Sequence, residues 1–275
     1  MFLLSAGLIL TATLSTTMVA QSLVDLSARA RQSTVALFGC SGPTKEVCRG
    51  TGPAGVVPQW SRLGSGVTVA TGRLVTAGHV LKTPQVLLAL AVRPDSVWQE
   101  DKLYPALVVA DDDATDLAVL AVPGFPSRPA DLGAKEDIKI GAEIFYIGHP
   151  SFMLGPFLGT GVVASDEMSW TVDGKQRSLY GLNATINPGN SGGGVFLRDS
   201  GRLIGIVNAK AGSLSRGLQA LRDQKFDGRI VVSGVDPVAA LQQTLREMEA
   251  NLQLGVGAFS GIDRVNAILA GIKRP

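Results

Sequence analysis

The chain has 275 residues, of which 45% are hydrophobic and 17% are charged. This much apolar material supports a sizeable core and excludes an intrinsically disordered protein. The formal net charge is only +2, aromatic residues make up 5%, and no block of basic residues occurs. These features exclude the electrostatic footprint of a nucleic-acid-binding protein. The length allows one large all-β unit or two modest domains, and the 33 glycines and 14 prolines indicate many turns.

The first 24 residues carry no charged side chain. Residues 2–14 have the apolarity of a signal-peptide core, and Ala20 is a small residue suited to a cleavage point. The basic residues that usually precede such a core are missing, so an uncleaved anchor and a buried N-terminal helix stay open as alternatives. We expect residues 1–20 to be a signal peptide or an N-terminal anchor. The protein is then exported, periplasmic or secreted, and any membrane attachment runs through residues 2–20.

Cys40 and Cys48 are the only two cysteines, and they lie in a loop that contains glycine and proline. In an exported chain a local, even pair predicts a disulfide bond. Two unpaired thiols are the alternative. No histidine or third cysteine lies nearby, so we expect no metal site there.

Taken in chain order, the motif Ser22-x-x-Asp25 predicts a short capped helix over residues 23–32. A hairpin turning at Thr71-Gly72 is the clearest of the strand signals that follow. The predicted strands of this half are 34–38, 64–70, 73–76, 85–92, 104–110 and 117–122. Three aspartates at 111–113 indicate a solvated turn, with calcium ligation as a weaker alternative.

Residues 123–129 are rich in proline and glycine and form the best linker in the chain. Short strands without intervening helices follow it, which favours a sandwich or a barrel over a βαβ fold. The predicted strands of this second half are 143–147, 161–164, 179–186, 195–197 and 203–208.

Helical patterns replace strand patterns near the end of the chain. A brief helix is predicted near residues 214–221, and a longer one begins after Asp236 with Pro237 in its first turn. A final helix is predicted over about 262–270, beginning with Ser260-x-x-Asp263.

Ser191 lies in the stretch Asn187-Pro188-Gly189-Asn190-Ser191-Gly192-Gly193-Gly194, between two strand-like runs. Glycines there permit unusual backbone conformations, so that the amides of Gly189 and Ser191 can converge on an oxyanion. A serine nucleophile needs a histidine base, and both histidines, His79 and His149, precede it. The nucleophile elbow of α/β-hydrolases requires a later histidine. The order His79, Asp116, Ser191 is instead that of chymotrypsin.

Several motifs resemble trypsin-fold serine proteases of the HtrA or Deg type. They are Gly64-Ser65-Gly66, Thr76-Ala77-Gly78-His79-Val80, Thr115-Asp116-Leu117-Ala118-Val119-Leu120, Gly148-His149-Pro150, the Ser191 stretch, Gly205-Ile206-Val207-Asn208 and Gly255-Val256-Gly257-Ala258-Phe259. The resemblance implies an all-β fold of two six-stranded antiparallel β-barrels with the triad in the cleft between them. It also implies His79 as general base, Asp116 as its orienting acid and Ser191 as nucleophile, with the Gly189 and Ser191 amides as oxyanion hole. His149 is then not needed.

The same resemblance places the specificity pocket near five residues of the second half. They are Thr185, Ile186, Asn208, Ala209 and Lys210. None is acidic, so we expect small or medium apolar side chains before the cut. The chain departs from the family pattern at Gly194, where a proline is usual, and in a helix-bearing insertion at about 212–254. That insertion either gates the pocket or is a packed decoration.

The sequence thus predicts a first unit at residues 21–130, with the N-terminal helix, and a second at 131–275, with the insertion and the C-terminal helix. The predicted activity is that of a serine endopeptidase that cuts exposed or unfolded segments of protein. Its partners are protein or peptide substrates, and no cofactor is expected. A trypsin-fold scaffold that binds peptides without cutting them is the alternative.

Overall fold

The computed structural model describes most of the chain after residue 20. The described ranges are 21–49, 51–82, 87–91, 103–153, 155–172, 174–210, 216–226, 231–252 and 254–272. The expected signal peptide or anchor at residues 1–20 lies outside them. Within these ranges no helix is long and apolar enough to cross a membrane.

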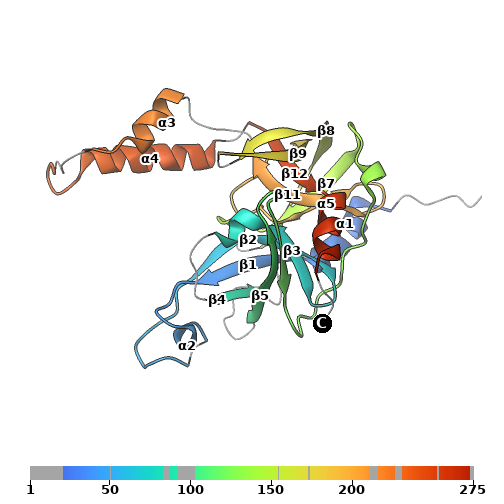
Figure 1. Ribbon diagram of the computed structural model, residues 1–275, viewed down its shortest axis with the longest axis horizontal. Helices are drawn as coiled ribbons and strands as arrows, with labels where there is room; N and C mark the ends of the chain where they lie inside the picture. Colours follow the sequence, from blue (N-terminus) through green and yellow to red (C-terminus); the bar gives the residue numbers. More distant parts are fainter. Residues whose placement is uncertain are drawn as a thin grey trace, which may run out of the picture.

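In the part of the chain that the structure describes, twelve strands form two closed antiparallel barrels of six strands each, which confirms the predicted fold class (Figure 1). The first barrel consists of β1 (Thr34–Cys40), β2 (Trp60–Ala70), β3 (Arg73–Ala77), β4 (Leu87–Ala91), β5 (Leu103–Asp112) and β6 (Leu117–Ala121), in the order β1-β2-β3-β6-β5-β4. β1 also pairs with β4, which closes the barrel. The predicted β2–β3 hairpin is confirmed, and Gly72 at its turn has a φ of 66°.

The second barrel has the same number of strands. It consists of β7 (Glu143–Gly148), β8 (Phe157–Val172), β9 (Lys175–Asn183), β10 (Gly194–Leu197), β11 (Leu203–Lys210) and β12 (Val256–Gly261), in the order β10-β11-β12-β9-β8-β7. Gly194 opposes Ile147 of β7 on one side and Ile206 of β11 on the other. Gly194, which stands where the resembled family usually has a proline, is therefore held by a paired strand on each side.

Strands β3 and β6 of the first barrel contribute side chains to two apolar clusters. Leu74 and Leu120 belong to the cluster inside the first barrel. Their chain neighbours Val75 and Val119 point to the opposite face, because side chains alternate along a strand, and join the cluster of the second barrel. The two barrels therefore share a continuous apolar contact, which makes these strands buried on both faces.

Five α-helices complete the fold over the described residues. They are α1 (Leu23–Ser33), α2 (Lys45–Cys48), α3 (Arg216–Asp223), α4 (Pro237–Asn251) and α5 (Ile262–Ala270). The predicted caps of α1 and α4 are confirmed: Ser22 accepts a hydrogen bond from the amide of Asp25, and Asp236 accepts from those of Val238 and Ala239. Figure 1 shows α3 and α4 as an arm that extends away from both barrels.

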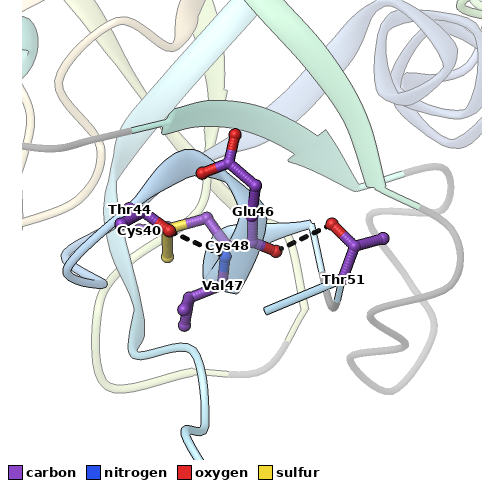
Figure 2. The surroundings of a disulfide bond; sticks show 6 residues. All are labelled: Cys40, Thr44, Glu46, Val47, Cys48 and Thr51. Atoms are coloured by element: carbon purple, nitrogen blue, oxygen red, sulfur yellow. Dashed lines mark hydrogen bonds between the residues drawn. A yellow bond between two sulfur atoms is a disulfide. The ribbon is translucent and has the colours of Figure 1, made fainter. Parts of the chain in front are cut away.

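The predicted disulfide is present and joins Cys40 at the end of β1 to Cys48 at the end of α2. Figure 2 shows the short helix between them, where Thr44 accepts a hydrogen bond from the amide of Val47 and the Thr51 hydroxyl donates to the carbonyl of Glu46. Closing so short a loop stabilises a fold by about 2–3 kcal/mol in the chain-entropy model. The bond therefore anchors the long β1–β2 connection to its own barrel.

Candidate active site

His79 and Asp116 lie at neighbouring ends of two paired strands. Ala77 at the end of β3 opposes Leu117 at the start of β6. His79 follows in the 3-10 turn η1 (Gly78–Leu81), whose first amide donates a 2.8 Å hydrogen bond to the carbonyl of Asp116. A Cβ on Gly78 would lie 3.3 Å from the Asp116 carboxylate. Strand pairing and this glycine together bring the two side chains into contact.

The Asp116 carboxylate makes two separate contacts with His79. Its Oδ1 accepts a 2.8 Å hydrogen bond from the His79 main-chain amide, and its Oδ2 lies 2.7 Å from Nδ1 of the ring. Asp116 is fully buried, whereas the His79 side chain is 25% exposed. A carboxylate at Nδ1 fixes the tautomer that carries its proton there, which leaves Nε2 as a hydrogen-bond acceptor.

The surroundings of Asp116 keep its carboxylate ionised. Burial by itself raises the pKa of Asp116, but hydrogen bonds from His79 and Asn208 and the charge of Arg177 outweigh it and lower that pKa below the ordinary value. The residue has a φ of 54°, a left-handed conformation that aspartate adopts more readily than most side chains. The backbone at Asp116 thus adopts an uncommon conformation that places its carboxylate against His79.

Asn208 of β11 supports Asp116 from the second barrel. Its amide nitrogen lies 3.1 Å from Asp116 Oδ2 and 2.9 Å from the Asp116 carbonyl, and its Oδ1 accepts from the Ser260 amide at 2.9 Å. The Ser260 hydroxyl donates to the carbonyl of Thr115. The final helix was predicted to begin with Ser260-x-x-Asp263, but Ser260 lies at the end of β12 and Gly261 occupies the N-cap of α5.

Ser191 lies on a tight loop that main-chain hydrogen bonds hold against β11. The amide of Gly192 donates to the Val207 carbonyl, and the Val207 amide donates to the Gly193 carbonyl, both at 2.8 Å. Gly192 has a φ of 84°, and a Cβ there would lie 2.0 Å from the Ser65 carbonyl oxygen. Only glycine fits such an approach without displacing backbone.

Two amides of this loop differ from their neighbours. The amides of Asn190, Gly192 and Gly193 each donate a main-chain hydrogen bond. Across the described ranges, the amides of Gly189 and Ser191 donate none. They are the two amides that the sequence predicts for an oxyanion hole.

Ser65 of β2 ties the first barrel to this loop. Its amide donates a 2.8 Å hydrogen bond to the carbonyl of Ser191, and its hydroxyl donates a 2.7 Å bond to the carbonyl of Gly189. The same hydroxyl accepts from the amide of His149 at 2.8 Å. Ser65 is fully buried, so these bonds fix the loop against the barrel that carries His79.

The serine and histidine segments lie against one another around Gly64. A Cβ on Gly64 would lie 2.8 Å from a methyl of Val80, the residue after His79, and 2.9 Å from the carbonyl oxygen of Ser191. No hydrogen bond joins the Ser191 hydroxyl to the His79 ring in the described structure. Such bonds are often long in ligand-free serine enzymes and tighten when substrate binds.

The five predicted pocket residues have different surroundings. Thr185 is exposed, and its carbonyl accepts a hydrogen bond from the Tyr146 hydroxyl. Ile186 is buried, and its side chain lies directly against Gly257. The Asn208 side chain is buried against Asp116, so any contact that Asn208 makes with substrate comes from its main chain. Ala209 is partly exposed, and the side chain of Lys210 lies outside the described residues.

His149 is fully buried beside the serine loop, and neither of its ring nitrogens has an aligned hydrogen bond with a described group, although the Thr34 main chain is near. Burial, assisted by the charge of Arg62, lowers the pKa of His149 to about 3. The ring is therefore neutral at physiological pH.

Two buried residues that sequence reasoning gave no role belong to this site. One is Ser65, inside a motif noted only for its resemblance. The other is Arg177 of β9, whose guanidinium lies 2.6 Å from Asp116 Oδ2. One weak indication of its role was present in the sequence. Arg177 and Leu179 are two residues apart, so they face the same buried side of the strand, where an arginine is unusual. Among the described side chains, no group of three or more histidine, cysteine, aspartate or glutamate residues is placed to hold a metal ion.

Comparison with known proteins identifies the family. A family model described as a trypsin-like peptidase domain matches residues 64–206, which is more than half of the chain. Protease Do-like 1, chloroplastic, from Arabidopsis thaliana is 36% identical over 159 residues, covering 56% of this chain and 34% of the relative. Serine endoprotease DegS from Escherichia coli (strain K12) is 35% identical over 150 residues, covering 52% of this chain and 39% of the relative. The chain thus matches well under half the length of these curated relatives.

Solved structures agree on the fold. The HtrA-type protease AlgW, solved with a decapeptide, superposes with a TM-score of 0.62 at 20% identity, covering 92% of this chain and 67% of that one. The active form of the Rv3671c protease from M. tuberculosis gives a TM-score of 0.58 at 19% identity, covering 98% and 96%. The family model and the curated relatives show that the chain belongs to the trypsin-like peptidase family and is homologous to the Do-like and DegS proteases.

Proposed function

We propose that this chain is a serine endopeptidase that works through His79, Asp116 and Ser191. The observation that carries the proposal is the 2.7 Å contact between His79 Nδ1 and a fully buried Asp116 carboxylate. Such a pair has one established use next to a glycine-framed serine, which is to provide a base that accepts the serine proton.

In the proposed mechanism, Nε2 of His79 takes the proton from the Ser191 hydroxyl as its oxygen attacks the carbonyl carbon of the peptide bond. The bond that forms is the Ser191 Oγ–carbon ester bond, and the one that breaks is the carbon–nitrogen bond. The imidazolium returns its proton to the leaving amine, and water then releases the acyl group by the same steps. Asp116 stays ionised throughout and stabilises the imidazolium.

The oxyanion of the tetrahedral intermediate is assigned to the amides of Gly189 and Ser191. Both lack another acceptor within the described chain, while the flanking amides are engaged. Preorganised amides of this kind each contribute about 3–4 kcal/mol to transition-state stabilisation. The Ser65 bond to the Gly189 carbonyl orients the peptide that presents them.

Protein or peptide segments in exposed or unfolded proteins are the proposed substrates. The relatives are named proteases and endoproteases, and one structural neighbour was solved with a decapeptide. No acidic side chain occurs among Thr185, Ile186, Asn208, Ala209 and Lys210, which supports cleavage after small or medium apolar residues. The disulfide between Cys40 and Cys48 supports export to an oxidising compartment. We further assign residues 21–130 and 131–275 as the two domains.

A peptide-binding scaffold without activity is the second candidate. The absence of a Ser191–His79 hydrogen bond across the described residues favours it. The buried, ionised Asp116 argues for the enzyme instead, because a scaffold gains nothing from a desolvated carboxylate at an imidazole.

A fluorophosphonate probe separates the two. We expect it to modify Ser191 of the folded chain, as detected by mass spectrometry of the labelled peptide, and to block cleavage of an unfolded protein substrate. Ser191→Ala should take up no probe and should lose about a millionfold in kcat. Absence of labelling in a folded chain with its disulfide formed would support the scaffold.

A further inference from the structure

Arg177 is a buried cation contributed by the second barrel to the histidine–aspartate pair. It lies in β9, where its neighbours Gln176 and Ser178 are exposed, whereas Arg177 itself is 2% exposed. An arginine is rarely buried to this extent unless its charge is paired. Its position on the strand aims the guanidinium at the turn before β6.

The guanidinium has one close partner. One terminal nitrogen lies 2.6 Å from Asp116 Oδ2, and the other lies 3.9 Å from the nearer carboxylate oxygen of Asp113. The contact with Asp116 is an ion pair rather than an aligned hydrogen bond, and no nitrogen of Arg177 has an aligned acceptor within the described chain. Attraction to the Asp116 charge is therefore what compensates the burial of this cation.

The other charged groups near Arg177 and Asp116 are paired with one another or exposed to water. Asp113 bonds to Lys82 at 2.8 Å and to Lys175, and these two lysines lower its pKa to about 2. Burial raises the pKa of Asp111, which lies near Gly78. Asp113 is half exposed, so water screens its effect on the site. Arg177 is thus the one fully desolvated charge besides Asp116 among these described groups.

We propose that Arg177 is a positioning residue that acts on His79 through Asp116, and that it lowers the pH at which His79 becomes a neutral base. The proposal rests on the function proposed above for His79. It adds a specific regulator of the working pH range, drawn from the opposite barrel.

The sign of the effect follows from the shared oxygen. Asp116 Oδ2 contacts both the imidazole Nδ1 and the guanidinium. A protonated imidazole would then lie beside a carboxylate whose charge already balances a cation, and it would also be repelled by that cation. Protonation of His79 is disfavoured, so the neutral ring persists to lower pH. Without Arg177, the full charge of Asp116 would stabilise the imidazolium.

Proton NMR of histidine tests this without requiring activity. The chain has only two histidines, and His149 is fully buried whereas His79 is partly exposed, so the two ring resonances can be assigned and followed separately as the pH is changed. The Ser191→Ala background prevents self-cleavage. Arg177→Met should move the His79 titration midpoint upward by about one pH unit. Arg177→Lys, which keeps a charge but not the planar fork, should move it less.

Lys175→Met is the matched control, because it removes one positive charge from the same strand where the partner is the exposed Asp113. It should leave the midpoint unchanged. In the active chain, the acid limb of kcat/KM against pH should move with the NMR midpoint, and KM should stay constant. If Arg177→Met fails to fold, Arg177→Gln carries the same expectation.

An unchanged His79 midpoint in a folded Arg177→Met or Arg177→Gln variant would overturn the proposal. So would an equal shift in Lys175→Met, since it would indicate a general charge effect. A chain that neither labels nor cleaves would instead refute the proposed enzyme activity, while the NMR titration would still report on Arg177.

Discussion

The two halves of the site are held in place by different chemistry. Around Asp116, side chains from three elements converge on one carboxylate: His79 after β3, Arg177 on β9 and Asn208 on β11. Around Ser191, main-chain amides and carbonyls carry most of the bonds, and the Ser65 hydroxyl adds a side-chain bond to the Gly189 carbonyl. The first half is specified by charge, and the second by backbone shape.

Each half also contains one histidine, and their environments are opposite. His79 is partly exposed with a carboxylate at Nδ1, whereas His149 is fully buried without an aligned hydrogen bond from its ring. Under the proposed mechanism, its carboxylate partner and its access to solvent are what suit His79, and not His149, to act as the base. Position beside the serine loop is not sufficient.

Among the variants that test this comparison of the two halves, the largest effect is expected from removing the charge of the first half. Asp116→Asn replaces an acceptor by an amide, which stabilises the wrong imidazole tautomer and leaves Arg177 without its anion. We expect kcat to fall about 10⁴-fold, and the loss of a buried ion-pair partner to destabilise the fold by about 3–5 kcal/mol. Peptide-cleavage kinetics and urea unfolding measure the two effects separately.

Asp112→Asn is the control for that variant. Asp112 accepts from the Ala114 amide and the Thr115 hydroxyl in the same turn, and it contacts neither His79 nor Arg177 in the described structure. Its kcat should stay within a fewfold of the parent. A loss of less than tenfold in Asp116→Asn would contradict the role given to the carboxylate.

A smaller effect is expected in the second half, from Ser65→Ala. The variant removes the donor to the Gly189 carbonyl and the acceptor of the His149 amide, leaving two buried polar groups unsatisfied at about 1–3 kcal/mol each. Because the Gly189 peptide is then less firmly oriented, kcat should fall about 10–100-fold with little change in KM.

Ser33→Ala separates stability from catalysis in this comparison. Ser33 is equally buried and its hydroxyl donates to the Ala30 carbonyl in α1, which lies outside the site. The variant should lose stability but keep its kcat. If both serine variants lost activity in proportion to stability, the oxyanion loop would not depend specifically on Ser65.

Local signals in the sequence were sufficient for much of the fold and for the loop around Ser191. The Ser22 and Asp236 caps, the Thr71-Gly72 turn and the glycines near Ser191 each act within a few residues. Strand β8 was predicted only at 161–164 but spans Phe157–Val172. The rest of the strand was missed because its residues are mostly polar or exposed and do not show the apolar alternation that indicates a strand.

Contacts between distant segments could not be predicted in this way. Asn208 was expected in the specificity pocket because of the family resemblance, yet its side chain bonds to Asp116 of the other barrel. Arg177 is 61 residues from Asp116 in sequence, and nothing between them indicates that the two meet. Ser260 was expected at the start of the final helix, yet its hydroxyl donates to the Thr115 carbonyl, which is 145 residues away in the sequence.

The smallest expected effect concerns His149 and the stability of the second half in acid. The folded chain holds this ring neutral with a pKa of about 3, whereas in an unfolded chain a histidine binds a proton near pH 6.5. Below that pH the unfolded state binds more protons, so stability present at neutral pH is lost as the pH falls toward 3. Between pH 7.5 and 5.5 this contributes a loss of about 1.4 kcal/mol. His149→Gln cannot titrate, so its unfolding free energy in urea should fall by about that much less over the same interval. Parallel pH dependences of the parent and the variant would mean that the buried ring does not resist protonation, and that the two histidines differ less than their surroundings indicate.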